Sequence, residues 1–191
     1  MPKETFFNLD EGKKEAIIKV LIDEFTSKPF KDVTVKGIVD RLQIARGSFY
    51  QYFEDLEDSY FFILDRETHD VHLLFMKLFA EHSGDILRSL EEFGTQVSEM
   101  IFDERKYPIY RNRYLSWNED LDRNWNKCHR DRYGIFHKEN SELGIDGELV
   151  YFIRAVLHSL IERNFRLGWT KEVFLETYKT HLNWMKEGVI Q

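Results

Sequence analysis

Apolar residues recur every three or four positions along most of this chain, the spacing that places them on one face of an α-helix. The alternating apolar and polar residues that are typical of strands are nearly absent. We therefore predict an all-α fold. The predicted helices cover residues 8–28, 34–42, 45–53, 55–83, 85–104, 146–168 and 170–185.

Helix-capping and helix-breaking residues fall between these segments. Ser, Thr, Asn and Asp side chains cap helices by accepting a hydrogen bond from a free backbone N–H. The expected caps are Asn8, Thr34, Asp55, Asp146 and Thr170. Pro29 disfavours helix at the preceding residue, and Gly168 fits a helix end. The charged stretch 126–144 is expected to continue a helix to about residue 140 and then to form a loop.

The segment from Thr34 to Phe53 has the pattern of two short helices joined by a tight break. The apolar positions of the second helix recur at i, i+4 and i+8, which gives it its own buried edge. Its other side combines a guanidinium, an amide, a hydroxyl and phenols, groups that suit phosphates and base edges. We interpret the segment as a DNA-reading helix-turn-helix. The candidate DNA-binding residues are Thr34, Lys36, Arg46, Gly47, Ser48, Tyr50, Gln51 and Tyr52.

Charge supports a local DNA contact. The formal net charge is -7, which argues against nucleic-acid binding over the whole surface. Residues 28–52 nevertheless carry five Lys and Arg against two Asp, a local excess of +3.

We expect a cytoplasmic protein without a membrane span. The sequence has a single cysteine, Cys128, and it has neither a signal-like start nor a long apolar run.

The run R-G-S-F-Y-Q-Y-F followed by E-D-L-E-D-S resembles the signature of TetR-family transcriptional regulators. The match covers Ala45 to Phe53 in order and extends back through Thr34 and the first helix, about the first quarter of the chain. Three positions depart from the family pattern. Gln43 stands where the turn usually has Gly, Ala45 replaces the usual Ser or Thr cap, and Leu56 replaces a phosphate-binding Lys.

The resemblance implies a three-helix DNA-binding domain with a helix-turn-helix, residues 1–54, and a larger helical ligand-binding and dimerisation domain, residues 55–191. It also implies a homodimer on a palindromic double-stranded DNA operator, and a ligand-responsive repressor. In relatives the last two helices form the dimer interface. The matching apolar positions are Ile153, Val156, Leu157, Leu160, Phe174, Tyr178, Leu182 and Met185. An intramolecular core would produce the same pattern.

The aromatic-rich stretch 107–125 is a candidate wall for a pocket that binds a small apolar or aromatic effector, because pockets combine apolar walls with a few polar groups. The alternative is that these rings pack between helices. The candidate ligand-binding residues are Tyr107, Tyr110, Tyr114, Trp117, Trp125 and Phe152.

No complete catalytic or metal-binding motif accompanies these patterns. His69 and His72 flank Asp70 without a further spaced ligand, and Cys128-His129 lacks an oxyanion-donor motif; we place the latter pair on a charged helix surface. We expect no metal, no cofactor and no catalytic residue. Two alternatives remain: an all-α enzyme or small-molecule carrier whose first three helices do not bind DNA, and a helical protein that binds other proteins through its last two helices. The first alternative would lack salt-dependent binding to a palindrome. The second is compatible with the dimer and would need a different protein as its partner.

Overall fold

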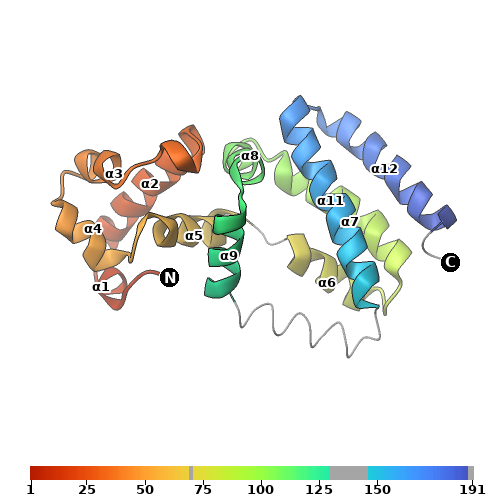
Figure 1. The fold of residues 1–191 in the computed structure, drawn as a ribbon, viewed down its shortest axis with the longest axis horizontal. Helices are drawn as coiled ribbons and strands as arrows, with labels where there is room; N and C mark the ends of the chain where they lie inside the picture. Colours follow the sequence, from red (N-terminus) through yellow and green to blue (C-terminus); the bar gives the residue numbers. More distant parts are fainter. Residues whose placement is uncertain (69–70, 130–145, 189–191) are drawn as a thin grey trace. The chain divides into compact units, whose positions relative to one another are not determined.

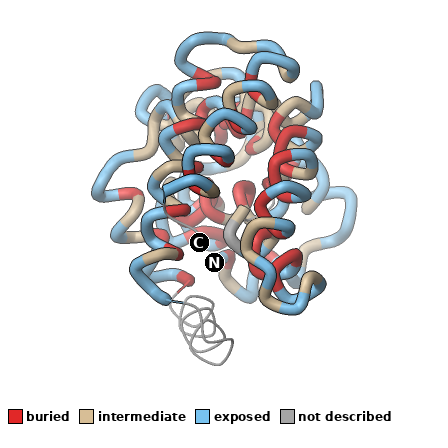
Figure 2. The backbone as a smooth tube through the Cα atoms, turned by 90° about the vertical axis from the view of Figure 1, so that its right-hand side faces the viewer, coloured by how far each residue is buried: buried red, intermediate tan, exposed pale blue. Residues whose placement is uncertain are grey.

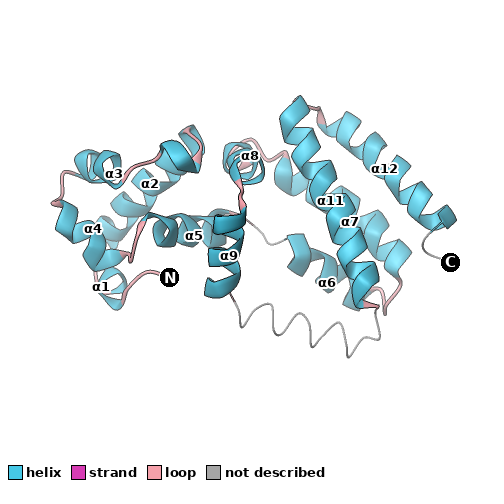
Figure 3. Ribbon diagram, viewed as in Figure 1, coloured by secondary structure: helices cyan, strands magenta, loops and turns pink. Residues whose placement is uncertain are grey.

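The computed structural model describes residues 1–68, 71–129 and 146–188. This part of the chain is built from helices, and no strand occurs in it (Figure 3). The predicted all-α fold is confirmed. The predicted features within 130–145 and the pair His69 and Asp70 lie outside the described residues. None of the described helices combines the length and apolar character needed to cross a bilayer.

The chain forms two compact units (Figure 1). Unit 1 contains residues 1–68 and 108–129, and unit 2 contains residues 69–107 and 130–191. The predicted functional division at residues 54 and 55 stays a prediction. The packing of the helices does not follow this division. Phe61, which falls in the predicted second domain, packs within unit 1, where its ring lies 5.2 Å from the ring of Trp125.

Unit 1 has an aromatic core. Its rings include Phe6 and Phe53, with centroids 5.3 Å apart, and Phe25 and Tyr60, 4.9 Å apart. Figure 2 shows buried and exposed residues alternating in short stretches along the helices, as expected for helices with one buried face. The helices of unit 1 are α1 (Glu4–Phe7), α2 (Glu11–Ser27), α3 (Val35–Leu42), α4 (Arg46–Tyr52), α5 (Leu56–Glu67), α8 (Tyr107–Ser116, from residue 108) and α9 (Glu119–Cys128), with a 3-10 turn η1 (Phe30–Asp32).

Unit 2 is organised around one central helix, α7, which packs against α6 and α12. Phe93 and Val97 of α7 and Phe174 of α12 are almost completely buried. The helices of unit 2 are α6 (Val71–Glu81), α7 (Ile86–Ile101), α11 (Gly147–Leu167) and α12 (Lys171–Gly188).

Most predicted caps are confirmed. The side chains of Thr34, Asp55, Asp146 and Thr170 each accept a hydrogen bond from a backbone N–H of the first turn that follows. Gly168 ends α11 with φ 64°, in the left-handed region. The cap expected at Asn8 is wrong: Asp10 caps α2, and Asn8 instead follows the short helix α1, which the sequence pattern did not indicate.

The single helix predicted over residues 55–83 is also wrong, because α5 ends at Glu67. Thr68 has an extended backbone, with φ -112° and ψ 143°. Its hydroxyl donates to the Leu64 carbonyl at 2.6 Å and accepts from Arg113 Nη1 at 3.0 Å. The side chain therefore stabilises the helix end, which apolar periodicity alone cannot reveal.

Asn112 of α8 fixes the C-terminal end of α2. Its side-chain Nδ2 lies 3.0, 3.0 and 3.1 Å from the carbonyl oxygens of Phe25, Thr26 and Lys28. The last carbonyls of a helix lack intrahelical partners, and Asn112 is buried, so this amide supplies bonds that water cannot.

Asn112→Ala should lower the free energy of unfolding by about 1–3 kcal/mol, because it leaves buried carbonyls without their donor. Chemical denaturation followed by circular dichroism measures this change. Arg111→Ala, at the exposed neighbouring position, is the control and should leave stability nearly unchanged. Equal stability of both variants would show that the Asn112 bonds contribute nothing.

Candidate nucleic-acid interface

The turn between α3 and α4 is built without glycine. Gln43 ends α3 in the left-handed region, with φ 53° and ψ 40°, and its backbone N–H bonds back to Asp40 O and Val39 O. Ala45 precedes α4 and gives no side-chain cap. A residue other than Gly in this region carries a conformational cost, and the missing cap costs about 1 kcal/mol, so packing must hold the turn.

Two phenylalanines of the α4 segment supply that packing. Phe49 and Phe53 are 1% and 0% exposed, and their ring centroids lie 5.4 Å apart. Ile38 and Val39 of α3 are also buried. The predicted apolar edges are therefore confirmed at these four residues, whereas Ala45, the first position of the predicted α4 edge, is exposed. The opposite side of α4 is left outside the core.

The outer side of α4 presents polar groups. Arg46, Gly47, Tyr50 and Gln51 are exposed, and Ser48 is half-buried. Arg46 Nη2 lies 3.4 Å from Tyr50 Oη, with the guanidinium 5.9 Å from the Tyr50 ring. A Cβ added at Gly47 would have no atom within 4 Å, so the protein's own packing does not require glycine there.

Tyr52 is the exception among the predicted reading residues. It is 6% exposed, its ring lies 6.4 Å from the Phe6 ring, and Lys13 Nζ lies 5.9 Å from its centroid. Its predicted position on the outer face is wrong. Tyr52 follows Phe49 by three residues and so shares the buried edge, which Phe6 of the undetected helix α1 covers.

The N-terminal segment braces the end of α4. Lys3 donates from its backbone N–H to Tyr52 O at 2.8 Å and from Nζ to Tyr50 O at 3.0 Å, and Thr5 Oγ1 donates to Gln51 O. These bonds satisfy the last carbonyls of a seven-residue helix. The sequence pattern gave no sign of this support.

The other two predicted residues lie on α3 and at its start. Thr34 Oγ1 accepts a hydrogen bond from Gly37 N at 3.1 Å, and Thr34 is exposed. Lys36 is exposed and pairs with Asp40 at 2.6 Å. Lys36 can leave this exposed pair at little cost, because such pairs are worth about 0–1 kcal/mol.

A buried carboxylate joins α2 to α3. Glu24 is 4% exposed and pairs with Lys28 at 2.6 Å and with Arg41 at 3.1 Å. Burial raises the pKa of Glu24, but hydrogen bonds from Lys28 and Arg41 outweigh that effect and hold the pKa below its ordinary value. This contribution to stability is present at neutral pH and is lost as the pH falls through the lowered pKa. Arg41 is thus engaged within the protein.

The predicted ligand-binding residues are divided between the two units, and their role in binding a ligand stays a prediction. Tyr110 and Trp125 are buried in unit 1, where Arg113 lies 5.4 Å from the Trp117 ring and 5.0 Å from the Trp125 ring. Phe152 of unit 2 is 41% exposed. Tyr107 packs on Phe165 in unit 2, and Tyr114 is half-buried in unit 1. Packing between helices, the alternative reading, describes Tyr110, Trp117 and Trp125.

His129, expected on a charged surface, is instead buried in unit 1. Its Nε2 lies 2.7 Å from Asp65 Oδ2, its Nδ1 lies 2.9 Å from Trp125 O, and its ring stacks on Trp125 at 3.9 Å. The residue therefore ties α9 to α5. Its neighbour Cys128 is exposed.

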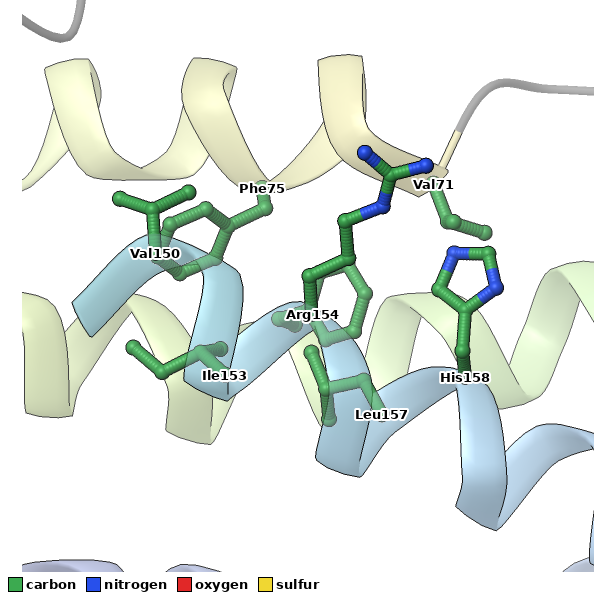
Figure 4. Close-up of a pocket in the computed structure, with 8 residues that line it drawn as sticks. Val71, Phe75, Val150, Ile153, Arg154, Leu157 and His158 are labelled. Carbon is green, nitrogen blue, oxygen red and sulfur yellow. The ribbon is translucent and has the colours of Figure 1, made fainter. Parts of the chain in front are cut away.

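An apolar cavity occurs elsewhere, within unit 2 (Figure 4). It lies between α6, α7 and α11, and the predicted aromatic segment contributes nothing to it. Its lining residues are Val71, Phe75, Phe93, Val150, Ile153, Arg154, Leu157 and His158. Its apolar residues come from three separate helices, so no single stretch of sequence could have indicated it.

The residues predicted for a dimer interface lie mainly inside unit 2. Ile153, Leu157, Leu160, Phe174, Tyr178, Leu182 and Met185 are each less than 9% exposed, and Val156 is half-buried. The Tyr178 hydroxyl donates to Leu90 O at 2.6 Å. Seven of the eight therefore belong to the core of one chain, which corrects the prediction, since a side chain covered by its own chain has little surface left for a second copy.

Residues 86–188, more than half of the chain, match the family described as "Tetracyclin repressor, C-terminal domain". Residues 17–58 match "Bacterial regulatory proteins, tetR family". The second match contains α3, the turn and α4. No protein with a curated description matches the chain.

Two solved structures illustrate the shared fold. A TetR family transcriptional regulator from Chloroflexus aurantiacus J-10-FL is 22% identical, with 98% of each chain covered and a TM-score of 0.52. Native NalD, the secondary repressor of the MexAB-OprM multidrug efflux pump in Pseudomonas aeruginosa, is 17% identical, with 90% of this chain and 95% of that chain covered and a TM-score of 0.64. A helix-turn-helix unit followed by a helical C-terminal domain is therefore confirmed as the fold.

Proposed function

We propose a homodimeric, ligand-responsive repressor as the specific function of this chain, which belongs to the TetR family of bacterial regulatory proteins. The chain is a DNA-binding transcriptional regulator. The proposal adds repression in the cytoplasm, a palindromic operator, a second copy of the chain and a small effector. It assigns no catalytic step to the protein.

The outer face of α4 carries the proposal. Phe49 and Phe53 anchor the helix by one edge, so Arg46, Gly47 and Gln51 face outward together. Arg suits guanine edges or phosphates and Gln suits adenine. The exposed hydroxyls of Tyr50 and Thr34 and the ammonium of Lys36 suit the DNA backbone, and Ser48 lies beside them.

Gly47→Ala should leave folding intact and lower operator affinity on the order of tenfold, as the loss of one good base contact would. The new Cβ meets no protein atom, and alanine favours helix by up to about 1 kcal/mol. The same methyl group would keep α4 away from the floor of the major groove. Fluorescence anisotropy with an operator selected from random duplexes measures the affinity.

Gly12→Ala is the matched control for this change. Gly12 is the second residue of α2, just as Gly47 is the second residue of α4. A Cβ added at Gly12 would lie 3.5 Å from Asp10 Oδ1, an ordinary van der Waals contact. We expect wild-type DNA affinity from this control. Unchanged affinity of Gly47→Ala would remove α4 from close contact with DNA.

The second copy is proposed to bind the sides of α11 and α12 that the core does not use. Phe152 on α11 is 41% exposed, and Val173 and Trp184 on α12 are 41% and 61% exposed. Aromatic residues are enriched at the cores of protein interfaces, so Phe152 and Trp184 are the candidate contacts. A two-fold dimer would place its reading helices about 34–36 Å apart, on successive turns of a palindrome.

The effector is proposed to bind the cavity of unit 2. A ligand changes DNA affinity only as far as it binds one conformation better than the other. Its lining helix α6 follows α5 of unit 1 directly in the chain, separated only by residues 68–70, so movement of α6 has a short covalent path to the DNA-binding unit.

An operator-binding assay with a transcription reporter tests the whole proposal. The protein should shift the DNA that flanks its own gene, lose affinity steeply as salt rises, and lower reporter expression. Raised reporter expression would identify an activator. DNA binding that depends neither on the DNA sequence nor on the salt concentration would instead favour the carrier or enzyme alternative.

A further inference from the structure

The cavity of unit 2 has apolar walls, and one of its lining residues is the cation Arg154, which bears on the charge of the molecule that the cavity accepts. We propose that the cavity binds a small amphipathic carboxylate, with the apolar body between α6, α7 and α11 and the carboxylate on Arg154. This inference rests on the proposed ligand response and specifies the chemical class of the effector.

The apolar and the polar lining residues occupy different parts of the cavity. Phe75 of α6, Phe93 of α7 and Leu157 of α11 are buried and form part of the apolar wall. Arg154 and His158 lie one helical turn apart on α11, and both side chains extend toward the start of α6, beside Val71 (Figure 4). The polar groups are therefore gathered at one end of an apolar site.

Arg154 has no hydrogen-bond or ion-pair partner among residues 1–68, 71–129 and 146–188. The other two arginines of α11, which lie near its C-terminal end, have partners within the protein. Arg163 lies 4.8 Å from the Trp169 ring, and Arg166 pairs with Glu162. A guanidinium beside apolar walls favours a planar anion, because a carboxylate can accept two parallel hydrogen bonds from it.

Partial exposure makes this pairing favourable. Arg154 is half-buried, so pairing with a carboxylate does not require full removal of either charge from water. A ligand ammonium would meet repulsion, and a neutral hydroxyl would gain a weaker hydrogen bond. The site therefore selects for a negative head group on an apolar body.

The cavity is too small for an apolar ligand as it stands. Its volume is about 20 Å³, whereas one water needs roughly 10–15 Å³ measured in the same way. An effector with an apolar body must therefore part α6 from α11. Such opening is the kind of change by which a ligand selects a minor conformation, which fits a response that acts through α6.

The test compares octanoate, 1-octanol and octylammonium, which share one chain and differ in the head group. Isothermal titration calorimetry on the full-length protein without DNA measures their affinities. Octanoate should bind about tenfold or more tightly than octanol, the effect of one charged hydrogen bond, and octylammonium should bind most weakly. Arg154→Gln should remove the preference for octanoate, Arg154→Lys should keep part of it, and Arg163→Gln should leave it unchanged.

Melting temperatures of the variants confirm that each is folded. Equal binding of octanoate and octanol, an unchanged preference in Arg154→Gln, or failure of all three compounds to bind would overturn the inference. An operator assay then separates the two proposals. Arg154-dependent octanoate binding without release of DNA would contradict the ligand response while leaving the assignment of the site intact.

Discussion

Gly94→Ala should lower the free energy of unfolding of unit 2 by about 3 kcal/mol or more, at the upper end of the usual cost of overpacking. Gly94 lies in α7 against the ring of Tyr178 in α12. A Cβ at this position would lie 2.3, 2.5 and 2.9 Å from three ring carbons. Contacts below 3.0 Å do not persist, so the ring or the helix must move.

The ring has little freedom to move. Tyr178 is 3% exposed, and its hydroxyl is held by Leu90 O at 2.6 Å, one turn before Gly94. Burial also raises the pKa of Tyr178, so this hydroxyl remains a hydrogen-bond donor throughout the neutral range. Displacing the ring would break that bond and disturb the packing of α7 against α12.

A double-mutant cycle isolates the cause. In a Tyr178→Ala background the ring is absent, so Gly94→Ala should be neutral or should stabilise through its helix propensity, worth up to about 1 kcal/mol. Thermal and urea denaturation of the four proteins give the coupling free energy. Equal effects of Gly94→Ala in both backgrounds would show that the Tyr178 ring is not the source of the cost.

Local interactions account for what the sequence predicted well. The Thr34 and Asp55 caps and the apolar edge formed by Phe49 and Phe53 depend on residues three or four positions apart, and the structure contains them. The helix-turn-helix could therefore be predicted from one stretch. The turn persists without glycine at Gln43, so its position is set by packing more than by the turn residue itself.

Contacts between distant segments account for the errors. Tyr52 is buried because Phe6, 46 positions earlier, covers it, and α5 ends where Thr68 meets Arg113, 45 positions later. Periodicity reports that a residue is covered, but not by which segment. The same limit applies to Phe174 and Tyr178: an apolar stripe looks alike whether its partner is α7 or a second chain.

A dimer interface therefore has to be sought among exposed residues. Of these, Trp184 is the one whose substitution we expect to affect dimer formation most. Its side chain is 61% exposed, an unusual state for tryptophan, and its ring contacts His181 edge-on at 5.2 Å. Val173 lies three helical turns earlier on the same side of α12 and is 41% exposed. The core of the same chain leaves both side chains exposed.

Trp184→Glu should convert the dimer into a folded monomer and lower operator affinity by about 10²–10⁴-fold, because a single reading helix loses the advantage of two linked half-sites. Asn183→Glu adds the same charge at an exposed position beside the groove between α7 and α12, and should remain dimeric. Light scattering after size exclusion gives the mass, and anisotropy gives the affinity.

A dimeric Trp184→Glu variant would place the interface elsewhere. A monomeric variant that kept full affinity would instead separate operator recognition from dimer formation, because each reading helix would then bind its half-site independently.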